Sequence, residues 1–542
     1  MPKIVIDERE IDCRSGISVL QAALEAGMDV PHYCYHPGLS IVASCRLCLM
    51  EMKIPDPQTK RMVWGGKLVP SCQTPVRDGI EVRFDSERVR ANQRHVMEHF
   101  LLNHPLDCPI CDQAGECWLQ DYSLKFGTAT SRMVEEKIKN PKKDVGPRTL
   151  LYQDRCVLCT RCVRFTREVT ATAELCVVNR GGRLEIDAFP GKSLDNRLQG
   201  NVVDLCPVGA LLDKDFLFAQ RVWLLQGTPS VCPGCSTGCA IRIDHNDGRI
   251  YRLKPRYNPG VNEWWMCDDG RFGWKYVHEV EKRIGRPVLR RSTVMEPIAW
   301  EELPRLVRFR VEQQVRASGG RAVAVQLSPM MACEEAWLLV SFLRRLAPEA
   351  VLAMGPVPVD GHDECFPVGA VADEARFVLR AEKAPNRRGV EMVMQAAGGT
   401  VVDSTALWES VGKGEIAVLW VVGGYPRADW PARGQGAAMG RVAVSVVQDL
   451  FPNELTAAAT IVLPSCAWAE REGTFVNVGG LIQPFQRAVN PPEELRADGQ
   501  YLYELAGYEG LYGGARVREI MAREIPAFAV VREAPPLPVH AH

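Results

Sequence analysis

Two different periods of apolar residues occur in the first thirty positions. Apolar and polar residues alternate in "KIVIDEREI" at 3–11, which predicts a strand, a tight turn and a second strand. In "SVLQAALEAG" at 18–27 the apolar residues recur with helical spacing, which predicts an amphipathic helix ended by Gly27. A long loop that carries cysteines follows. The N-terminus is therefore predicted to be a small unit of strands and one helix whose chemistry lies in a loop.

In the second half of the chain, helical patterns alternate with short, wholly apolar segments. Residues 300–319 and 333–348 have helical periodicity. Four apolar runs have the length and composition of buried strands in a parallel sheet: 321–328, 416–424, 441–449 and 459–465. Alternating strands and helices predict an open, doubly wound α/β region. The glycine-rich run "RGQGAAMG" at 433–440 has no closely preceding strand, so we interpret it as a loop and helix start rather than a dinucleotide site.

Composition limits the function classes. The chain has 542 residues, of which 46% are hydrophobic and 24% charged, which is typical of a globular protein with roughly three to five domains. Its 65 Lys and Arg balance 66 Asp and Glu, so the net charge favours neither nucleic acid nor an anionic membrane as a partner. The longest apolar runs, such as 416–422, are too short to span a bilayer. Because a strand pattern begins at residue 3, we expect no leader peptide and a soluble, cytoplasmic, prokaryotic chain.

Cysteine carries most of the candidate chemistry. Of the 20 cysteines, 17 precede residue 270 at tight spacings, and only Cys333, Cys365 and Cys466 follow. Disulfide frameworks are typical of small secreted domains, whereas Cys-x2-Cys units in a large chain favour metal sites. Zinc is the alternative to iron–sulfur clusters at such sites, because zinc also binds four cysteines, or three cysteines and a histidine.

The first group is Cys34, Cys45, Cys48 and Cys72, spaced Cys-x10-Cys-x2-Cys-x23-Cys. Plant-type [2Fe–2S] ferredoxins use Cys-x4-Cys-x2-Cys and a distant fourth cysteine. The same plan with a longer first loop supplies two ligand pairs for two bridged irons. We therefore predict a [2Fe–2S] cluster here. Cys13 has no partner at metal spacing and is interpreted as a packed thiol.

The second group has three cysteines within one loop and no fourth cysteine nearby: Cys108, Cys111 and Cys117. The candidates for the fourth ligand are three histidines: His95, His99 and His104. His95 and His99 have the spacing of one helix face, whereas His104 lies in a loop just before Cys108, so we predict that His104 completes a [4Fe–4S] site. A neutral imidazole makes a cluster less negative, so we expect a higher potential than with four cysteines. A higher potential in His104→Cys would contradict this.

The third group is Cys156, Cys159 and Cys162, with the remote Cys206 followed by a proline. Bacterial two-cluster ferredoxins contain this run twice, and each Cys-Pro cysteine binds the cluster of the other run. Here the positions of the second ligand set hold other residues: Thr166, Asn196, Gln199 and Val202. The pattern therefore predicts a single [4Fe–4S] cluster with Cys206 as its remote ligand. Cys176 fits neither run and is interpreted as a buried thiol.

The fourth group is Cys232, Cys235 and Cys239, followed after 27 residues by Cys267. The zinc alternative is strongest here, because Cys-x2-Cys with a remote cysteine is common in zinc sites. The Cys-x3-Cys spacing of the third ligand and the presence of the other three groups favour a [4Fe–4S] cluster.

Three stretches carry a resemblance to a known family: "NHPLDCPICDQAGEC" at 103–117, "RCVLCTRCVRF" at 155–165 and "CPGCSTGC" at 232–239. With the four groups in this order, essentially the whole chain resembles the large iron–sulfur subunit of bacterial NADH:quinone oxidoreductase (the G subunit of respiratory complex I). The resemblance implies a relay of single electrons from NADH and flavin on a neighbouring subunit toward quinone. The relay would use one [2Fe–2S] and three [4Fe–4S] clusters, the fourth lying off the main path.

The resemblance also implies where the chain works and what it lacks. Its partners would be the flavin/NADH-binding subunit and other peripheral-arm subunits, with the membrane arm reached indirectly. It would lie on the cytoplasmic side of the plasma membrane, as a peripheral part of a membrane complex. No catalytic residue, no substrate site, no nucleic acid and no molybdenum are expected on this chain.

We predict a multidomain α+β and α/β protein. Its predicted parts are a β-grasp [2Fe–2S] ferredoxin-like domain at 1–82, a one-His/three-Cys [4Fe–4S] domain at 83–122, a bacterial-ferredoxin-like [4Fe–4S] domain at 140–220, a molybdopterin-oxidoreductase-type [4Fe–4S] domain at 225–281 and a molybdopterin-oxidoreductase-like, doubly wound α/β domain at 282–542. The segment "NPKKD" at 140–144 is predicted to be a solvated linker turn.

The main alternative is a molybdopterin-dependent catalytic subunit of the formate dehydrogenase type, because residues 467–489 resemble its pterin-binding region. Against it, Cys365 lacks a Cys-His context, Cys333 opens a predicted helix, and no further barrel domain is expected before residue 542. An iron-only hydrogenase would keep two complete ferredoxin runs and a Cys-Cys-Pro, which this sequence lacks. A diaphorase-type subunit would be much shorter. We therefore interpret the second half as a vestigial pterin fold kept as a scaffold.

Overall fold

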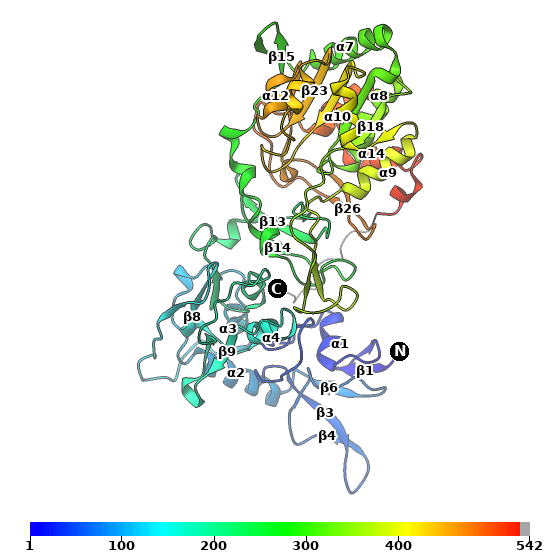
Figure 1. Ribbon diagram of the computed structural model, residues 1–542. Helices are drawn as coiled ribbons and strands as arrows, with labels where there is room; N and C mark the ends of the chain where they lie inside the picture. The colour runs from blue at the N-terminus through cyan, green and yellow to red at the C-terminus, as the bar shows by residue number, and fades with distance from the viewer. Residues whose placement is uncertain (532–542) are drawn as a thin grey trace.

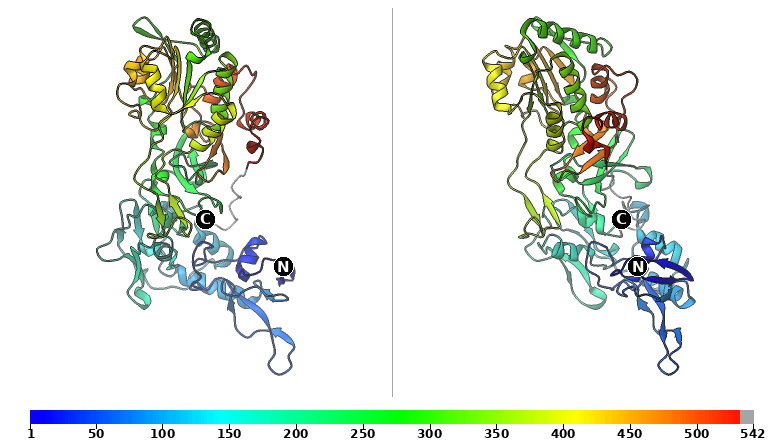
Figure 2. Two further views of the ribbon diagram at one scale, coloured as in Figure 1. Left: turned by 45° about the vertical axis from the view of Figure 1, so that its right-hand side comes forward. Right: turned by 90° about the vertical axis from the view of Figure 1, so that its right-hand side faces the viewer.

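The computed structural model describes residues 1–531, so the last part of the domain predicted at 282–542 lies outside the described residues. The molecule is elongated, with the cysteine-rich part at one end and the α/β region at the other (Figure 1). Two further views show the same division, with a narrow hairpin projecting from the N-terminal end (Figure 2). Among the described residues, no helix has the length and apolar character needed to cross a bilayer.

The N-terminal unit is a mixed sheet packed against one helix. The sheet has the order β2-β1-β6-β3-β4, with β5 on β3: β1 (Lys3–Ile6), β2 (Arg9–Asp12), β3 (Leu49–Pro55), β4 (Met62–Trp64), β5 (Val69–Pro70) and β6 (Glu81–Arg83). Strands β1 and β2 are antiparallel, whereas β1 and β6 are parallel. The Ser18 hydroxyl accepts a hydrogen bond from the Gln21 amide and caps α1 (Val19–Glu25), and Gly27 follows at φ +74°. The predicted strand, turn, strand and helix are confirmed.

Short helices and strands surround the second and third cysteine groups. The helices are α2 (Glu87–Leu101), α3 (Trp118–Phe126), α4 (Arg161–Glu168) and α5 (Asn201–Leu205), and the strands are β7 (Lys142–Asp144), β8 (Thr149–Tyr152), β9 (Leu175–Val178), β10 (Glu185–Ala188) and β11 (Leu211–Asp213). Strands β11, β8 and β7 form one antiparallel sheet, and β9 and β10 form a hairpin.

The prediction of a solvated turn at 140–144 is wrong for its last three residues. Lys142–Asp144 form the edge strand β7, paired antiparallel with β8. Both lysines have partners across the fold: the Lys142 ammonium lies 4.4 Å from the ring centroid of Tyr152, and Lys143 lies 2.6 Å from Asp187. Long-range pairing overrides the local charge pattern here, because strand formation depends on neighbours more than on intrinsic preference.

Between the two ends lies an antiparallel sheet of three strands, β12 (Gln226–Val231), β13 (Ala240–Asn246) and β14 (Arg249–Pro255), followed by α6 (Asp268–Phe272). The largest buried apolar cluster of the molecule passes through this region. It includes Cys34, Cys117 and Cys162 at one end, and Trp468 and Phe485 of the α/β region at the other. The cysteine-rich part and the α/β region are therefore joined by continuous apolar packing.

The α/β region has one sheet of eight strands in the order β16-β15-β24-β23-β22-β17-β18-β21. The strands are β15 (Val288–Arg291), β16 (Val294–Pro297), β17 (Val323–Leu327), β18 (Val351–Met354), β21 (Val401–Val402), β22 (Val418–Val422), β23 (Val444–Asp449) and β24 (Ile461–Pro464). Its six strands from β17 onward are parallel. The four predicted buried strands are confirmed as β17, β22, β23 and β24, and the doubly wound topology is confirmed with them.

Helices pack on both faces of this sheet: α7 (Leu303–Ser318), α8 (Cys333–Leu346), α9 (Arg387–Ala397), α10 (Ser404–Gly412), α11 (Gln435–Met439), α12 (Glu454–Ala458), α13 (Asp498–Leu505) and α14 (Gly514–Met521). Both predicted helices are confirmed as α7 and α8. The run at 433–440 is a loop that leads into α11, as predicted, with Gly434 at φ +92°.

One long excursion, residues 355–386, leaves the sheet and reaches the cysteine-rich part (Figures 1 and 2). It carries the hairpin β19 (Glu364–Phe366) and β20 (Phe377–Leu379). Among the hydrogen bonds that attach it to that part, the Arg376 guanidinium donates to the Gly38 carbonyl at 2.7 Å, and the Val368 amide donates to the Thr170 carbonyl at 3.0 Å. A second hairpin, β25 (Gly473–Val476) and β26 (Ile482–Phe485), packs against β12.

Candidate metal centres

The first group lies in the loop between α1 and β3 and in the turn after β5. All four thiols are buried. The Sγ atoms of Cys34 and Cys45 are hydrogen-bonded at 3.6 Å, and this bond lowers the pKa of Cys34 to about 5. A hydrogen bond with Cys72 in the same way lowers the pKa of Cys48 to about 7. The four sulfurs thus form two pairs, which is the donor arrangement that two bridged irons need.

The second group lies between α2 and α3, in a loop that the third group helps to shape. Cys111 and Cys117 are buried, whereas Cys108 is exposed. A Cβ atom on Gly209, three residues after Cys206, would overlap the Sγ atom of Cys111. The Trp118 amide donates to the Pro207 carbonyl at 3.0 Å. The backbone that follows the remote cysteine of the third group therefore packs directly on the second.

The three candidate histidines differ in their surroundings. His95 and His99 lie on α2 and are both exposed, whereas His104 is half-buried in the loop that follows. Burial, together with the positive charge of Arg155, lowers the pKa of His104 to about 4. Burial raises the pKa of Cys111, and the same arginine charge offsets part of that rise. His104 is therefore a neutral imidazole at neutral pH, as a metal ligand must be.

The third group lines one cavity. Cys156, Cys159, Cys162 and Cys206 surround it together with apolar side chains such as Leu151 and Ile186. Left-handed backbone at Leu158 (φ +50°) and Thr160 (φ +58°) turns the chain so that the clustered cysteines face the same space. Burial raises the pKa of the Cys159 thiol to about 11. A bound metal would favour the thiolate and reverse this.

The fourth group lines a second cavity, formed by Cys232, Cys235, Cys239 and Cys267. The loop is narrow: the Cys232 amide donates to the Cys239 carbonyl at 2.9 Å. The Sγ atom of Cys267 accepts from the Gly270 amide at 3.4 Å, and a Cβ on Gly270 would lie 2.8 Å from the Sγ of Cys232. Glycine is thus required where the backbone passes between two candidate ligands.

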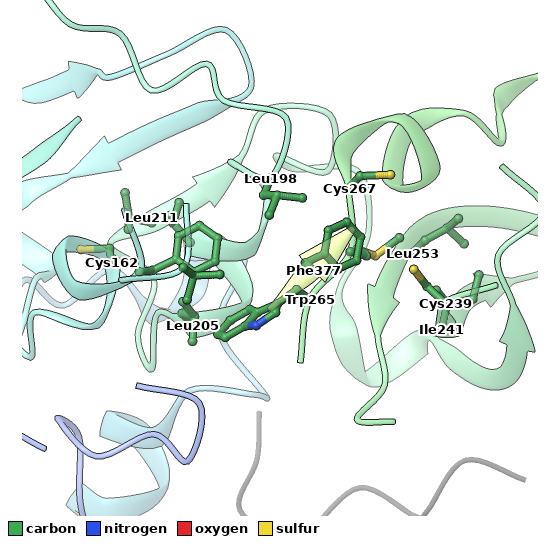
Figure 3. Packing of buried hydrophobic residues seen from close by; sticks show 14 of the residues in the cluster. Cys162, Leu198, Leu205, Leu211, Cys239, Ile241, Leu253, Trp265, Cys267 and Phe377 are labelled. Atoms are coloured by element: carbon green, nitrogen blue, oxygen red, sulfur yellow. The ribbon is translucent and has the colours of Figure 1, made fainter. Parts of the chain in front are cut away.

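The third and fourth groups lie on opposite sides of one aromatic residue. Figure 3 shows Cys162 with Leu205 on one side of Trp265, and Cys239 with Cys267 on the other. The ring centroids of Trp265 and Phe165 are 5.1 Å apart. Within residues 1–531, no three or more His, Cys, Asp or Glu side chains converge as a single metal ion would need.

Five cysteines lie outside the four groups: Cys13, Cys176, Cys333, Cys365 and Cys466. Cys13 is a packed thiol, as predicted, 3.5 Å from the Pro2 carbonyl. The interpretation of Cys176 as a buried thiol is wrong, because the β9–β10 hairpin leaves it half-buried. Cys333 is buried at the start of α8 and contacts Asn386, and Cys365 is partly exposed in β19.

Two residues of the segment 467–489, which resembles a pterin-binding region, form buried ion pairs within the chain. Arg471 pairs with Glu335 of α8 at 2.5 Å, and Glu470 pairs with Arg283 at 2.6 Å; all four side chains are buried.

The sequence patterns do not point to two buried arginines that lie beside the cysteine groups. Arg161 and Arg164 lie in the quoted motif at 155–165, and both have guanidinium groups among the cysteine groups. The signal that could have found them is a pair of arginines one helical turn apart, interleaved with cysteines. An arginine at such a position can affect the cysteine groups only if neighbouring segments bury its side chain beside them, and tertiary packing decides whether they do.

Five family models match the chain in succession. They are the 2Fe-2S iron-sulfur cluster binding domain at residues 3–87, the NADH-ubiquinone oxidoreductase-G iron-sulfur binding region at 93–132, the ferredoxin-like domain of NADH-quinone oxidoreductase subunit 3 at 146–212, the molybdopterin oxidoreductase Fe4S4 domain at 225–279 and molybdopterin oxidoreductase at 371–508. The predicted order of a 2Fe-2S domain, 4Fe-4S domains and a molybdopterin-oxidoreductase-like region is confirmed.

Curated relatives match more than half of the chain. The NADH-quinone oxidoreductase G subunit of Rickettsia typhi is 36% identical over 338 residues, which is 61% of this chain and 48% of the relative. The 75 kDa subunit of NADH-ubiquinone oxidoreductase of Reclinomonas americana is 35% identical over 360 residues, 66% of this chain and 50% of the relative. NADH dehydrogenase [ubiquinone] iron-sulfur protein 1 of Solanum tuberosum is 38% identical over 328 residues, 60% of this chain and 42% of the relative.

The chain spans about half the length of these relatives. The family models cover the cysteine groups in order, and those that name an NADH-quinone or NADH-ubiquinone oxidoreductase fall on the second and third groups. Over its cysteine-rich part the chain is therefore similar to the large iron–sulfur (G) subunits of NADH-quinone oxidoreductases.

Proposed function

We propose that this chain is an electron-transfer subunit of NADH:quinone oxidoreductase, which receives single electrons that began on NADH and passes them toward quinone. The observation that carries the proposal is the grouping of donors: the predicted ligands lie in four separate groups, and cysteines of the first, second, third and fourth groups share one continuous apolar core. A zinc-stabilised scaffold would need no such continuity between its sites.

The proposal assigns sixteen ligands to four clusters. They are Cys34, Cys45, Cys48 and Cys72 for one [2Fe–2S] cluster; His104, Cys108, Cys111 and Cys117 for a [4Fe–4S] cluster; Cys156, Cys159, Cys162 and Cys206 for a second; and Cys232, Cys235, Cys239 and Cys267 for a third. When bound, such clusters supply one-electron redox chemistry. The five-domain division given above belongs to the same proposal.

The rest of the chain would hold and insulate these groups. Buried side chains exclude water and oxygen, and the amides of Gly234 and Gly270 donate to candidate ligand sulfurs at 3.5 and 3.4 Å. Such hydrogen bonds, together with burial and local charge, set the potential of a cluster. No general base or nucleophile on this chain is needed for electron transfer.

Partners and location follow from the proposed role. Electrons would enter from a flavin/NADH-binding subunit and leave through other peripheral-arm subunits, with the membrane arm reached indirectly. The complex would lie on the cytoplasmic side of the plasma membrane. The fourth group can lie on this path or beside it, and the potential of its cluster would distinguish the two.

The test is the metal content of anaerobically purified protein. The proposal expects about 14 irons per chain, from one [2Fe–2S] and three [4Fe–4S] clusters, and no molybdenum. About one molybdenum per chain would overturn it in favour of a pterin-dependent dehydrogenase. About 10 irons with one zinc would reassign one four-cysteine group as structural. A colourless protein that contains no iron would contradict the proposal.

A further inference from the structure

Arg161 lies where three of the candidate sites meet. It is a residue of α4, between Cys159 and Cys162, and its side chain is 1% exposed. Its guanidinium donates to the Tyr35 carbonyl at 2.5 Å and to the Leu205 carbonyl at 3.3 Å. The guanidinium carbon lies 4.5 Å from the ring centroid of Trp118.

Each of these three neighbours is next in sequence to a predicted ligand. Tyr35 follows Cys34 of the first group, Trp118 follows Cys117 of the second, and Leu205 precedes Cys206 of the third. One guanidinium therefore touches the immediate support of a ligand in each of the first three groups. Among the described residues, Arg161 makes no such contact beside a ligand of the fourth group. That group lies on the other side of Trp265 from Cys162 (Figure 3).

A second guanidinium extends the same positive region. Arg164, one turn further along α4, donates to the carbonyl of Cys34 at 2.5 Å and to the carbonyl of Cys159 at 3.2 Å. It also donates to the Ser40 carbonyl. All the acceptors of both arginines are backbone carbonyls of the ligand loops, apart from the Thr160 hydroxyl near Arg164.

Neither arginine has a carboxylate partner. In the part of the chain that the structure describes, no Asp or Glu forms an ion pair with Arg161 or Arg164, and the buried Nε atom of Arg161 has no hydrogen-bond acceptor. Buried charges in proteins are normally paired, because an uncompensated charge away from water is costly. The charge that balances these arginines must come from something else at the junction.

Iron–sulfur clusters held by the predicted thiolates would provide negative charge at this place, and one-electron reduction of a cluster would add a further negative charge. A guanidinium keeps its proton throughout the physiological range. In an interior of low dielectric, a nearby positive charge stabilises the more negative, reduced form, so it raises the potential of the cluster.

We propose that Arg161, supported by Arg164, is a shared positioning residue that raises the midpoint potentials of the clusters in the first three groups together. The inference rests on the proposed function, since it needs clusters at these groups. A single buried cation that contacts all three ligand loops would shift the three potentials in the same direction, so its removal should lower them together.

The test is an EPR-monitored redox titration of anaerobically purified Arg161→Gln, Arg161→Lys and Arg164→Gln. In Arg161→Gln, the ratio of reduced to oxidised cluster at a fixed potential should fall about tenfold in the third group. This corresponds to a midpoint potential that is lower by about 59 mV for a one-electron couple. The midpoint potentials of the first and second groups should also become lower. Arg161→Lys, which keeps the charge, should recover most of the shift, and Arg164→Gln should give a smaller one.

The chain offers two matched controls. Arg167 is exposed on the same helix, so Arg167→Gln removes the same charge without changing the junction. The cluster of the fourth group serves as an internal reference in every variant. In Arg167→Gln, the midpoint potentials of the first three groups should equal those of the unmodified protein within the error of the titration. The midpoint potential of the fourth group should be unchanged in every variant.

The outcomes separate the two claims. If the unmodified protein contains no iron, the proposed function fails. If iron is present and Arg161→Gln leaves the potentials unchanged, or shifts the fourth group equally, the inference fails alone. If Arg161→Gln and Arg161→Lys lose iron to the same extent, Arg161 is structural and the inference is again overturned. Lower potentials in Arg161→Gln and Arg164→Gln that the lysine variant recovers would support it.

Discussion

Glycine at position 209 lets the backbone pass beside a predicted ligand of another site. Its missing Cβ leaves the space that the Sγ atom of Cys111 occupies, and Gln113 lies close on the same side. This is a contact between residues almost one hundred positions apart. Side-chain volume at one backbone position therefore decides whether the second and third groups can approach each other.

Gly209→Ala should disrupt the second site, because the methyl group and the Cys111 sulfur cannot share the same space. We expect a loss of about four irons per chain, as for one [4Fe–4S] cluster, with the third-group signal retained. Iron analysis and EPR of the reduced protein measure this. Gly182→Ala is the control, because a Cβ at Gly182 meets nothing within 4 Å. Equal iron in both variants would contradict the prediction.

Asp449 is a buried carboxyl at the end of β23. Its oxygens accept hydrogen bonds from the Gly424 amide at 2.9 Å, the Trp430 indole at 2.8 Å and the Asn453 side-chain amide at 2.7 Å. Burial outweighs these bonds and raises the pKa to about 6, from 3.8. The folded state therefore binds this proton more tightly than the unfolded state does.

This raised pKa predicts a pH dependence of stability. The contribution of Asp449 is fully present below about pH 4 and is lost as the pH rises to about 6, by up to about 3 kcal/mol. Asp449→Asn removes the titration, so the difference in free energy of unfolding between the two proteins should shrink over that range. Denaturant unfolding at several pH values measures it. A difference that stays constant with pH would contradict the assignment.

At the scale of elements, the excursion at 355–386 is one of the segments that join the α/β region to the cysteine-rich part. The Thr237 hydroxyl, within the loop of the fourth group, donates to the Val378 carbonyl of β20 at 2.9 Å. The Ser236 amide donates to the Glu382 carbonyl at 2.9 Å. The hairpin β19–β20 thus braces the loop that holds three of the four cysteines in this group.

Thr237→Val should weaken the contact between this loop and the hairpin, because valine has nearly the shape of threonine but no hydroxyl group. It leaves the Val378 carbonyl without its hydroxyl donor, so we expect a loss of about 1–3 kcal/mol in the free energy of unfolding. Cleavage of the hairpin by a protease should become faster. Thr130→Val, at an exposed threonine whose hydroxyl has no bond among the described residues, is the control. Identical cleavage rates in the two variants would show that the bond has no bracing effect.

At the scale of the whole molecule, two kinds of core coexist. The largest core contains candidate ligands as part of its apolar packing, whereas the cores on the two faces of the eight-stranded sheet contain none of them. If the clusters are present, their binding free energy belongs to the folding of the cysteine-rich part and not to that of the α/β sheet.

Removing iron with a chelator under anaerobic conditions should therefore affect the two ends unequally. We expect the thermal transition of the cysteine-rich part to be lost or to move to much lower temperature, and that of the α/β region to move far less. Calorimetry of the protein before and after chelation measures both. Re-loading with iron and sulfide is the control for damage. Equal shifts of both thermal transitions would contradict the assignment of the cluster-binding free energy to the cysteine-rich part alone.

Several features were readable from the sequence because they depend on neighbours close along the chain. Helix α1 and its end near Gly27 follow from local periodicity, and the buried strands β17, β22, β23 and β24 follow from short apolar runs. The grouping of cysteines follows from spacing within single loops. These patterns need no knowledge of what packs against them.

Tertiary structure decided the rest, because its causes lie far apart in the sequence. The charged segment Lys142–Asp144 became a strand only because β8 pairs with it. Cys176 is half-buried because its hairpin stands at the surface. Arg161 is enclosed by Tyr35 and Leu205, and the spacing of residues along the sequence does not show that these two residues lie beside it. The sequence by itself determined which residues can bind metal and in which loops; only the packed chain determined which charges surround them, since electrostatic neighbours are set by distance in space.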